Sequence, residues 1–265
     1  AAAEQTAGVI TAARLQAVMA GALDLQGDNR IAALGEVRAG SLQLANARDL
    51  VVSGPVQSAT GALLDVRNGN LQIDGLLSAQ DLRLQSAGNI AQGSGSSIVA
   101  QTLSGYSTGQ TRLGTADQFV ANQVGRLGDF TAPGGFSMTN AGTLTLGALN
   151  ASLFSVNAGT ADFFLKVDGG NLLQSGQAPV LAGNTRWWSS GVLGTSQDPL
   201  QLVTSTSVVN IDYSGSPPAF FDAVNIFGQP VVIANAVNLP IVGDGSREQN
   251  STKLRRPYVD VAALD

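Results

Sequence analysis

The same short sequence pattern occurs twice in this chain, 93 residues apart. It reads NRIAALGEVRA at 29–39 and NQVGRLGDFTA at 122–132. Asparagine, leucine and glycine stand at matching places in the two copies, namely Asn29, Leu34 and Gly35 in the first and Asn122, Leu127 and Gly128 in the second. A long-period repeat of this kind is typical of chains that stack one structural unit on the next.

The match continues on both sides of this pattern with small changes of offset. Upstream, residues 10–25 align with 98–113 at an offset of 88, so five extra residues precede Asn122. Downstream, residues 40–44 align with 134–138 one residue out of step. The long module therefore spans about 80–90 residues.

A shorter period runs inside the long module. Two apolar series share spacings of 19, 21 and 19 residues; they are Leu23, Leu42, Leu63 and Leu82, and Ile31, Leu50, Leu71 and Ile90. Two series with one common period predict coils of about 20 residues stacked in register, each adding short strands to long parallel sheets.

Short alternating stretches support a β-structure throughout. In Leu42-Gln43-Leu44, for example, the outer residues of the triplet face one side and the middle residue faces the other. LVVSGPV (50–56) and LQIDGLL (71–77) place a glycine at the same point, which indicates a tight corner between two faces. The alanine-rich stretch 12–22 is the best helical candidate, but its repeat partner is rich in Gly, Ser and Thr, so we predict coil and strand there. The predicted fold is all-β, a parallel β-helix.

Three regions follow from this pattern. We expect β-helix repeats over 1–178, end coils and an irregular β-rich cap over 179–242, and a polar tail over 243–265. The period weakens after about residue 178, and prolines such as Pro230 interrupt the β-rich runs that follow. The tail contains Arg255-Arg256-Pro257, for which we favour a solvated segment over a protease site or a docking patch.

Composition narrows the classes of function. Only 12% of the residues are charged, the net charge is −5 and no basic block occurs, which argues against nucleic-acid binding. The chain has no His and no Cys, so it lacks the commonest catalytic base, the thiol nucleophile and the usual zinc ligands. No apolar run reaches the roughly 18 residues of a membrane span. The opening residues 1–8 do not read as a signal peptide, and we interpret them as a processed terminus or boundary.

The repeats resemble those of filamentous-haemagglutinin-type exoproteins. The stretches that carry the resemblance are 122–132 with 136–138 and 144–146, 87–90 leading to 98–100, and 194–200. The resemblance implies a right-handed parallel β-helix exported from a Gram-negative bacterium by two-partner secretion. It implies a non-enzymatic secreted or surface-attached rod that adheres to surfaces or forms biofilm matrix, by end-to-end self-association or by binding a host or matrix ligand such as a glycan. The secretion domain of that family and an Arg-Gly-Asp tripeptide are absent from this sequence.

An enzyme on a β-helix is the alternative, since polysaccharide lyases and hydrolases also use this fold. Such chemistry needs carboxylates that face one groove, and Asp65, Asp74 and Asp81 form the densest acidic cluster. We favour solvent-facing positions for them, because no basic residue recurs at matching spacing. We expect no cofactor; Asp162 with Asp168, and the Gly-Asp-Gly at 243–245, are weak calcium candidates that plain turn chemistry explains better.

The tryptophan pair and the repeat corners are the remaining candidates. Trp187 and Trp188, beside Arg186, are suited to stacking on a sugar ring, although we favour a packing role in which one ring plugs the stack. We interpret Asn29 and Asn122 as corner residues that bond to the backbone. Gly35 and Gly128 are interpreted as corners too, as positions that need a positive φ. Leu34 and Leu127 complete the same corner motif.

Overall fold

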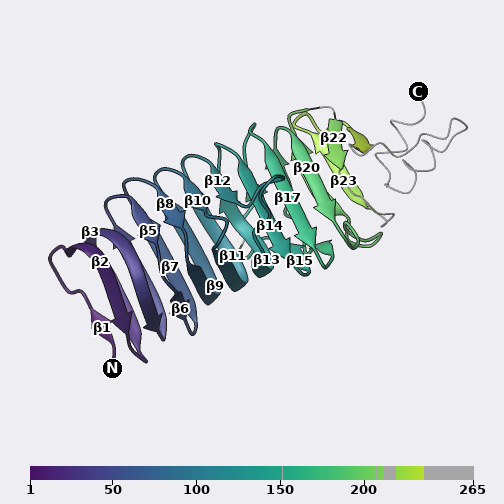
Figure 1. The fold of residues 1–265 in the computed structure, drawn as a ribbon. Helices are drawn as coiled ribbons and strands as arrows, with labels where there is room; N and C mark the ends of the chain where they lie inside the picture. Colours follow the sequence, from purple (N-terminus) through teal and green to yellow (C-terminus); the bar gives the residue numbers. More distant parts are fainter. Residues whose placement is uncertain (151, 207, 212–218, 236–265) are drawn as a thin grey trace, which may run out of the picture.

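The protein is an elongated β-solenoid. The computed structural model describes residues 1–150, 152–206, 208–211 and 219–235. Their regular structure consists of β-strands, which stack in parallel into about ten turns of about 21 residues each (Figure 1). Among these residues, no helix is long and apolar enough to cross a membrane. The predicted all-β, parallel β-helical fold is therefore confirmed.

The strands are short and follow one another around the rod. They are β1 (Ala3–Glu4), β2 (Thr11–Val18), β3 (Ala22–Ala39), β4 (Ser41–Asn46), β5 (Leu50–Val52), β6 (Val56–Ser58), β7 (Gly61–Val66), β8 (Leu71–Ile73), β9 (Leu76–Ser86), β10 (Ile90–Gln92), β11 (Ser97–Ser107), β12 (Thr111–Leu113), β13 (Gln123–Thr131), β14 (Phe136–Ala141), β15 (Leu144–Leu146), β16 (Val156–Asn157), β17 (Phe163–Asp168), β18 (Leu172–Gln174), β19 (Val180–Ala182), β20 (Thr185–Ser189), β21 (Leu200–Thr204), β22 (Val208–Ile211), β23 (Phe221–Asn225) and β24 (Val232–Asn235).

The register of these strands follows the predicted apolar series closely. Leu23 pairs with Leu42, and Leu50 pairs with Leu71, which pairs in turn with Ile90. The placement of Leu63 in the first series is wrong, because Leu42 pairs with Ala62. Successive side chains of a strand face opposite sides, so Ala62 points into the core and Leu63 points out. The stretch has leucines at both 63 and 64, which conceals this shift of one residue in the sequence.

Aliphatic side chains fill the core of the first half of the rod, and aromatic rings fill much of the second half. Five rings, each at most 1% exposed, form a continuous column of ring contacts along the core: Phe130, Phe136, Phe163, Trp187 and Phe221. The centroids of successive rings are 5.1, 5.7, 4.7 and 5.5 Å apart. Contacts of this kind add to the roughly 1.5–3 kcal/mol that burial of each large apolar side chain contributes.

The parallel stack continues beyond residue 178, where the period weakens in the sequence. Val180 pairs with Leu202, which pairs with Ala223, and β20, β22 and β24 pair in the same parallel manner. Turns of unequal length separate these strands, and they hide the period in the sequence although the register persists in space. Residues 236–242 and the expected tail at 243–265 lie outside the described residues.

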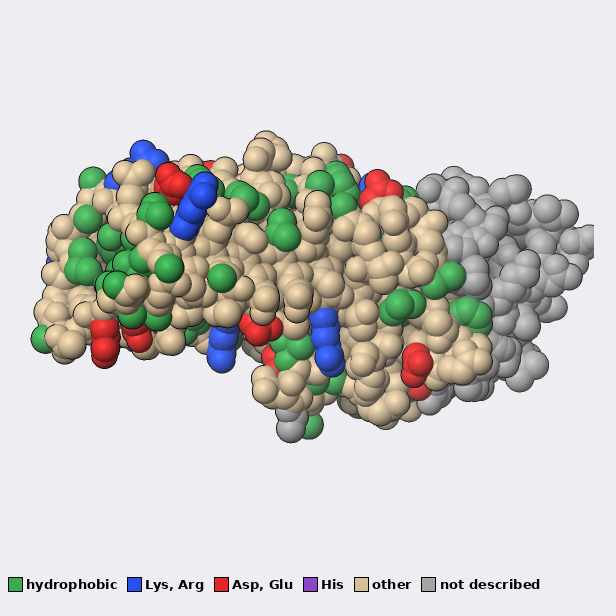
Figure 2. Space-filling model, turned by 90° about the horizontal axis from the view of Figure 1, so that it is seen from below, with side chains coloured by type: hydrophobic (Ala, Val, Ile, Leu, Met, Phe, Trp, Pro, Cys, Tyr) green, Lys and Arg blue, Asp and Glu red, His purple; other side chains and the backbone are tan. Residues whose placement is uncertain are grey.

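The first coil differs from those that follow. Residues 12–18 form strand, as expected for the alanine-rich stretch, and β2 pairs with β3 alone among the described strands. Its inward-facing Leu15 and the neighbouring Ile10 and Met19 are only partly buried against the core. Figure 2 shows hydrophobic side chains gathered over this end of the rod, at the left of the view.

Candidate functional site

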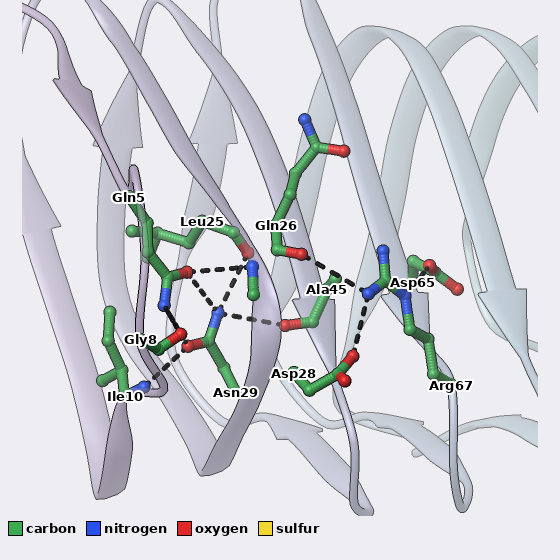
Figure 3. Close-up of polar contacts among 11 residues, drawn as sticks. Gln5, Gly8, Ile10, Leu25, Gln26, Asp28, Asn29, Ala45, Asp65 and Arg67 are labelled. Atoms are coloured by element: carbon green, nitrogen blue, oxygen red, sulfur yellow. Dashed lines mark hydrogen bonds and ion pairs between the residues drawn. The ribbon is translucent and has the colours of Figure 1, made fainter.

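Asn29 occupies a fully buried corner, where its amide joins three coils. Its Oδ1 accepts hydrogen bonds from the backbone N–H of Ile10 (2.8 Å) and from Nε2 of Gln5 (2.9 Å). Its Nδ2 donates to Oε1 of Gln5 (2.9 Å) and to the carbonyl oxygens of Leu25 (3.0 Å) and Ala45 (3.2 Å), as Figure 3 shows. The side-chain-to-backbone bonds expected at this corner are therefore present, together with an amide pair that the sequence did not indicate.

Asn122 makes the same set of bonds 93 residues later. Its Oδ1 accepts from the backbone N–H of Ile98 (2.8 Å) and from Nε2 of Gln92 (2.7 Å). Its Nδ2 donates to Oε1 of Gln92 (2.9 Å) and to the carbonyl oxygens of Leu113 and Thr139 (both 3.1 Å). Buried amides with every donor and acceptor occupied rigidify the corner where they lie.

The partners of the two amides are themselves related by the repeat. The matched pairs are Gln5 and Gln92, Ile10 and Ile98, Leu25 and Leu113, Asn29 and Asn122, and Ala45 and Thr139, with offsets of 87, 88, 88, 93 and 94 residues. The offset rises from 88 to 93 at the five-residue insertion before Asn122 and by one more residue after it, as the sequence alignment predicts. The long module is thus a structural repeat.

The glycine corners work by close approach, and the expected positive φ is absent. Neither Gly35 nor Gly128 has a positive φ; the positive φ lies at Asp129, at 52°. A Cβ on Gly128 would lie against the carbonyl group of Gly147 in the next coil. A Cβ on Gly35 would meet the side chain of Arg14. The adjoining Leu34 and Leu127 are fully buried core residues.

Asp129 fastens the loop that follows β15. Its carboxylate accepts hydrogen bonds from the backbone N–H groups of Leu149 (3.0 Å) and Asn150 (2.9 Å) and from Nδ2 of Asn150 (2.7 Å). Partial burial raises the pKa of Asp129, but these bonds and one from Ser152 outweigh it, so the pKa lies below its ordinary value.

The proposed acidic cluster does not converge on one groove. Asp81 pairs with Gly61, whereas Asp65 lies four residues further along that strand, about 13 Å away at about 3.3 Å per residue. Arg67 binds Asp65 and Asp28 (both 2.9 Å; Figure 3), and these two bonds raise the pKa of the Arg67 guanidinium. The carboxylate pair expected for glycoside chemistry is therefore not formed by these residues.

The remaining acidic candidates are also apart from one another. Asp74 lies at the corner after β8, where its Oδ1 accepts a hydrogen bond from Nε2 of Gln72 (2.6 Å). Asp162 and Asp168 lie at opposite ends of β17, about 20 Å apart. Within the described residues no group of three or more acidic side chains is arranged to hold a metal ion. The Gly-Asp-Gly at 243–245 lies outside those residues.

The tryptophan pair does not form one platform, because neighbouring residues of a strand face opposite sides. Trp187 is fully buried in the aromatic column, and its Nε1 has no hydrogen-bond partner. Trp188 points outward from β20, where the ammonium of Lys166 lies 4.5 Å from its ring centroid. Only Trp188 is thus placed to meet a ligand.

Trp188 belongs to a cluster on the outer surface that we name the aromatic–cation patch. Its five residues are Phe119, Phe164, Lys166, Arg186 and Trp188. Phe164 pairs with Arg186 and Lys166 pairs with Trp188 across β17 and β20, so aromatic and cationic side chains alternate in a two-by-two array. The Arg186 guanidinium lies 5.9 Å from the Phe164 centroid, and Lys166 lies 5.5 Å from the centroid of Phe119. Contacts of this type contribute about 0.5–1 kcal/mol each at exposed positions.

The five-residue insertion supplies the fifth member of this patch. Residues 114–121 form the loop that lengthens the second module, and Phe119 on this loop is 39% exposed. The hydroxyl of Thr139 on β14 binds both the N–H (2.8 Å) and the carbonyl oxygen (2.7 Å) of Val120. Thr139 also pairs with Lys166, which explains why Phe119 reaches the Lys166 ammonium.

The first module carries different residues at the equivalent places. Thr139, Lys166 and Trp188 correspond to Ala45, Asp65 and Gln85, while Phe164 and Arg186 correspond to Leu63 and Arg83. The first module thus retains one cation but has neither aromatic ring and carries a carboxylate where the second has Lys166. The aromatic–cation patch is therefore specific to the second module.

Comparisons with protein-family models, with curated proteins and with solved structures give no match for this chain.

Proposed function

We propose that this chain is a non-enzymatic, extracellular structural rod of a Gram-negative bacterium, which serves surface adhesion or the formation of matrix filaments. The observation that supports the proposal is the parallel stack, which runs from β1 to β24 and presents outward side chains at a constant coil spacing. About ten coils at about 4.8 Å each give a rod about 50 Å long. The resemblance to exported haemagglutinin-like proteins points to the same role, with two-partner secretion as the route.

The first coil supports a filament-forming version of this role. The outer edge of β2 carries backbone groups without a strand partner among the described residues. Val9 and Val18 on this coil are 56% and 71% exposed. An edge with apolar side chains is a template for a further coil, whether from this protein or from a second copy, and a head-to-tail contact between copies that does not close produces a filament.

Electron microscopy of the purified chain at several concentrations tests this proposal. Filaments many times longer than one rod are expected at high concentration. Leu15→Lys places a charge on the inward side of the first coil and is expected to shorten them. Gln16→Lys, which adds the same charge to the exposed neighbour, is the matched control and should leave filament length unchanged. Single short rods at every concentration would contradict the filament role and leave the adhesive role.

Carbohydrate binding is the second candidate function, and the aromatic–cation patch favours it. Exposed aromatic rings stack on sugar rings, and cations bind their acidic substituents. A carbohydrate-active enzyme finds less support, because the acidic residues that such an enzyme would have to bring together lie apart.

A further inference from the structure

We propose that the aromatic–cation patch is a binding site for an acidic polysaccharide, one whose sugars carry carboxylate or sulfate groups. The inference deepens the adhesive function proposed above and gives it a ligand class. It rests on the position of Lys166, on the flat array of rings and cations, and on the inserted loop that completes the site.

The Lys166 ammonium contacts aromatic rings and forms no ion pair with a carboxylate among the described residues. Its ammonium lies between the rings of Phe119 and Trp188, at 5.5 and 4.5 Å from their centroids. Among the described residues, no carboxylate lies within ion-pair distance of it. On a rod with a net charge of −5, Lys166 is therefore, within the described part of the chain, a cation without a carboxylate partner, and an anion that binds it does not have to displace one.

The geometry of the array suits a sugar chain. Neighbouring strands lie about 4.8 Å apart, and outward residues two positions apart on one strand are separated by about 6.6 Å. Phe164, Lys166, Arg186 and Trp188 therefore occupy a flat area the size of one or two sugar rings. A pyranose ring has an apolar C–H face that stacks on an aromatic ring, and an acidic substituent at its edge pairs with a cation.

The surface extends in the direction of the rod axis, as a polymeric ligand requires. Phe164 pairs with Ser137 in the preceding coil, and Ser137 pairs with Arg112 in the coil before that. This column adds a second exposed guanidinium group, that of Arg112, in line with Arg186. A flat, open site binds each sugar weakly, so repeated contacts along a polysaccharide are needed for useful affinity.

An acidic polysaccharide explains the patch better than an acidic protein segment does. Pairing between cations and carboxylates alone would use the charges and leave the aromatic rings without a role. The three rings are placed so that a ligand must present an apolar face and an anion together. At the equivalent positions of the first module the cation Arg83 is kept without the rings, and Asp65 stands in place of Lys166, so this module serves as an internal comparison.

Titration of the full-length chain with defined polymers tests the inference. The probes are polygalacturonate, dextran sulfate, uncharged dextran and polyglutamate, with binding measured by calorimetry at two salt concentrations. At least one of the two acidic polysaccharides is expected to bind, more weakly at higher salt, and uncharged dextran and polyglutamate are expected not to bind. Lys166→Gln and Trp188→Thr should each lower the affinity about tenfold. Gln85→Thr changes the first-module residue equivalent to Trp188, and Arg83→Gln removes the first-module cation equivalent to Arg186; both should leave the affinity unchanged.

Three results would overturn the inference: equal affinity of Lys166→Gln and the wild type, equal loss in the first-module controls, or binding of polyglutamate as strong as that of the acidic polysaccharides. The last result would make the patch a site for acidic protein segments. Circular dichroism checks that each variant is folded, and Lys166→Gln, at a surface position, serves if Trp188→Thr does not fold. Lys166→Gln is expected to leave filament length unchanged, so loss of glycan binding and loss of self-association are separate results.

Discussion

Asn122 shows how a single amide holds a corner of this core. It is fully buried, and its side chain satisfies a glutamine amide, one backbone N–H and two carbonyl oxygens. We expect Asn122→Ala to lower the free energy of unfolding by about 3 kcal/mol or more, because several buried polar groups lose their partner at once. Thermal unfolding followed by circular dichroism measures this. Asn89→Ala, which removes exposed bonds, is the control, with a loss near 1 kcal/mol; equal losses would contradict the role assigned to burial.

Trp187 combines a large apolar contact with an unsatisfied polar group. Truncation by Trp187→Ala should cost about 3–5 kcal/mol, because it opens a cavity in the aromatic column. Trp187→Phe loses some volume but also removes the buried N–H that has no partner, a group that costs about 1–3 kcal/mol. We therefore expect Trp187→Phe to stay within about 1 kcal/mol of the wild type in chemical denaturation. A loss as large as that of Trp187→Ala would show that the stability of the column depends on the shape of the indole ring and not on the apolar area that it buries.

Some residue roles were accessible from the sequence and others were not. Side chains alternate along a strand, so the sequence alone implies that Trp187 and Trp188 face opposite sides. This alternation was enough to exclude a sugar-binding platform made of both rings. The amide partners of Asn29 and Asn122 were missed, although extending the repeat upstream by a few residues aligns Gln5 with Gln92. Phe119 had no sequence signal beyond the insertion that carries it, because its neighbours come from strands more than forty residues away.

At the level of elements, the corner after β5 and β8 depends on stacked glycines. A Cβ on Gly54 would lie 2.7 Å from the carbonyl carbon of Gly35, and a Cβ on Gly75 would lie 2.9 Å from that of Gly54. The neighbour in each case is backbone, which cannot move aside without breaking the ladder. Gly75→Ala is therefore expected to destabilise the protein by more than about 2 kcal/mol.

Gly95 provides the matched control for this corner. No atom lies within 4 Å of a Cβ built on Gly95, so Gly95→Ala should change stability by less than about 0.5 kcal/mol. Differential scanning calorimetry of the two variants compares them directly. Similar melting temperatures would mean that the coils can separate slightly at the corner without loss of stability.

The loop after β15 should respond to pH through Asp129. Because the folded-state pKa of Asp129 lies below the ordinary value of 3.8, its carboxylate stabilises the folded state at higher pH. This contribution is lost as the pH falls from the ordinary pKa through the folded-state pKa. Asp129→Asn should therefore be less stable than the wild type at pH 7, and the difference should shrink below about pH 4. Unfolding curves at a series of pH values measure this difference in stability. A difference that does not change with pH would mean that the substitution acts through the backbone conformation at residue 129 and not through the carboxylate charge.

The sequence predicts elements well where turns have constant length. The apolar series located the strands from 23 to 90 to within one residue, because each coil there has 19 to 21 residues. From residue 99 onward the coils remain paired, yet the spacing between paired residues varies from 19 to 28, and beyond residue 178 it is 21–24. Turn length is set by local loops and not by the core, so it cannot be read from an apolar period.

For the whole molecule, the two periods of the chain do not divide evenly. The long module repeats after 93 residues and a coil takes about 21, so one module contains four coils and part of a fifth. Equivalent residues of the two modules therefore lie on different columns of the rod: Asp65 and Gln85 on one, Lys166 and Trp188 on another. The fold class could be predicted from the short period. The position of the aromatic–cation patch on the surface could not, because it depends on the mismatch between the module length and the coil length.

The direction of the ladder hydrogen bonds has a mechanical consequence. These bonds link coil to coil, so they lie along the rod axis, and a tension applied at the two ends loads them one coil after another. Each opened coil releases about 20 residues, or about 70 Å of extended chain. An optical-tweezers trace should therefore show a series of similar small steps near this length and not one large rupture. A surface-attached rod of this kind would lengthen under flow and dissipate the load gradually while its remaining coils stay folded.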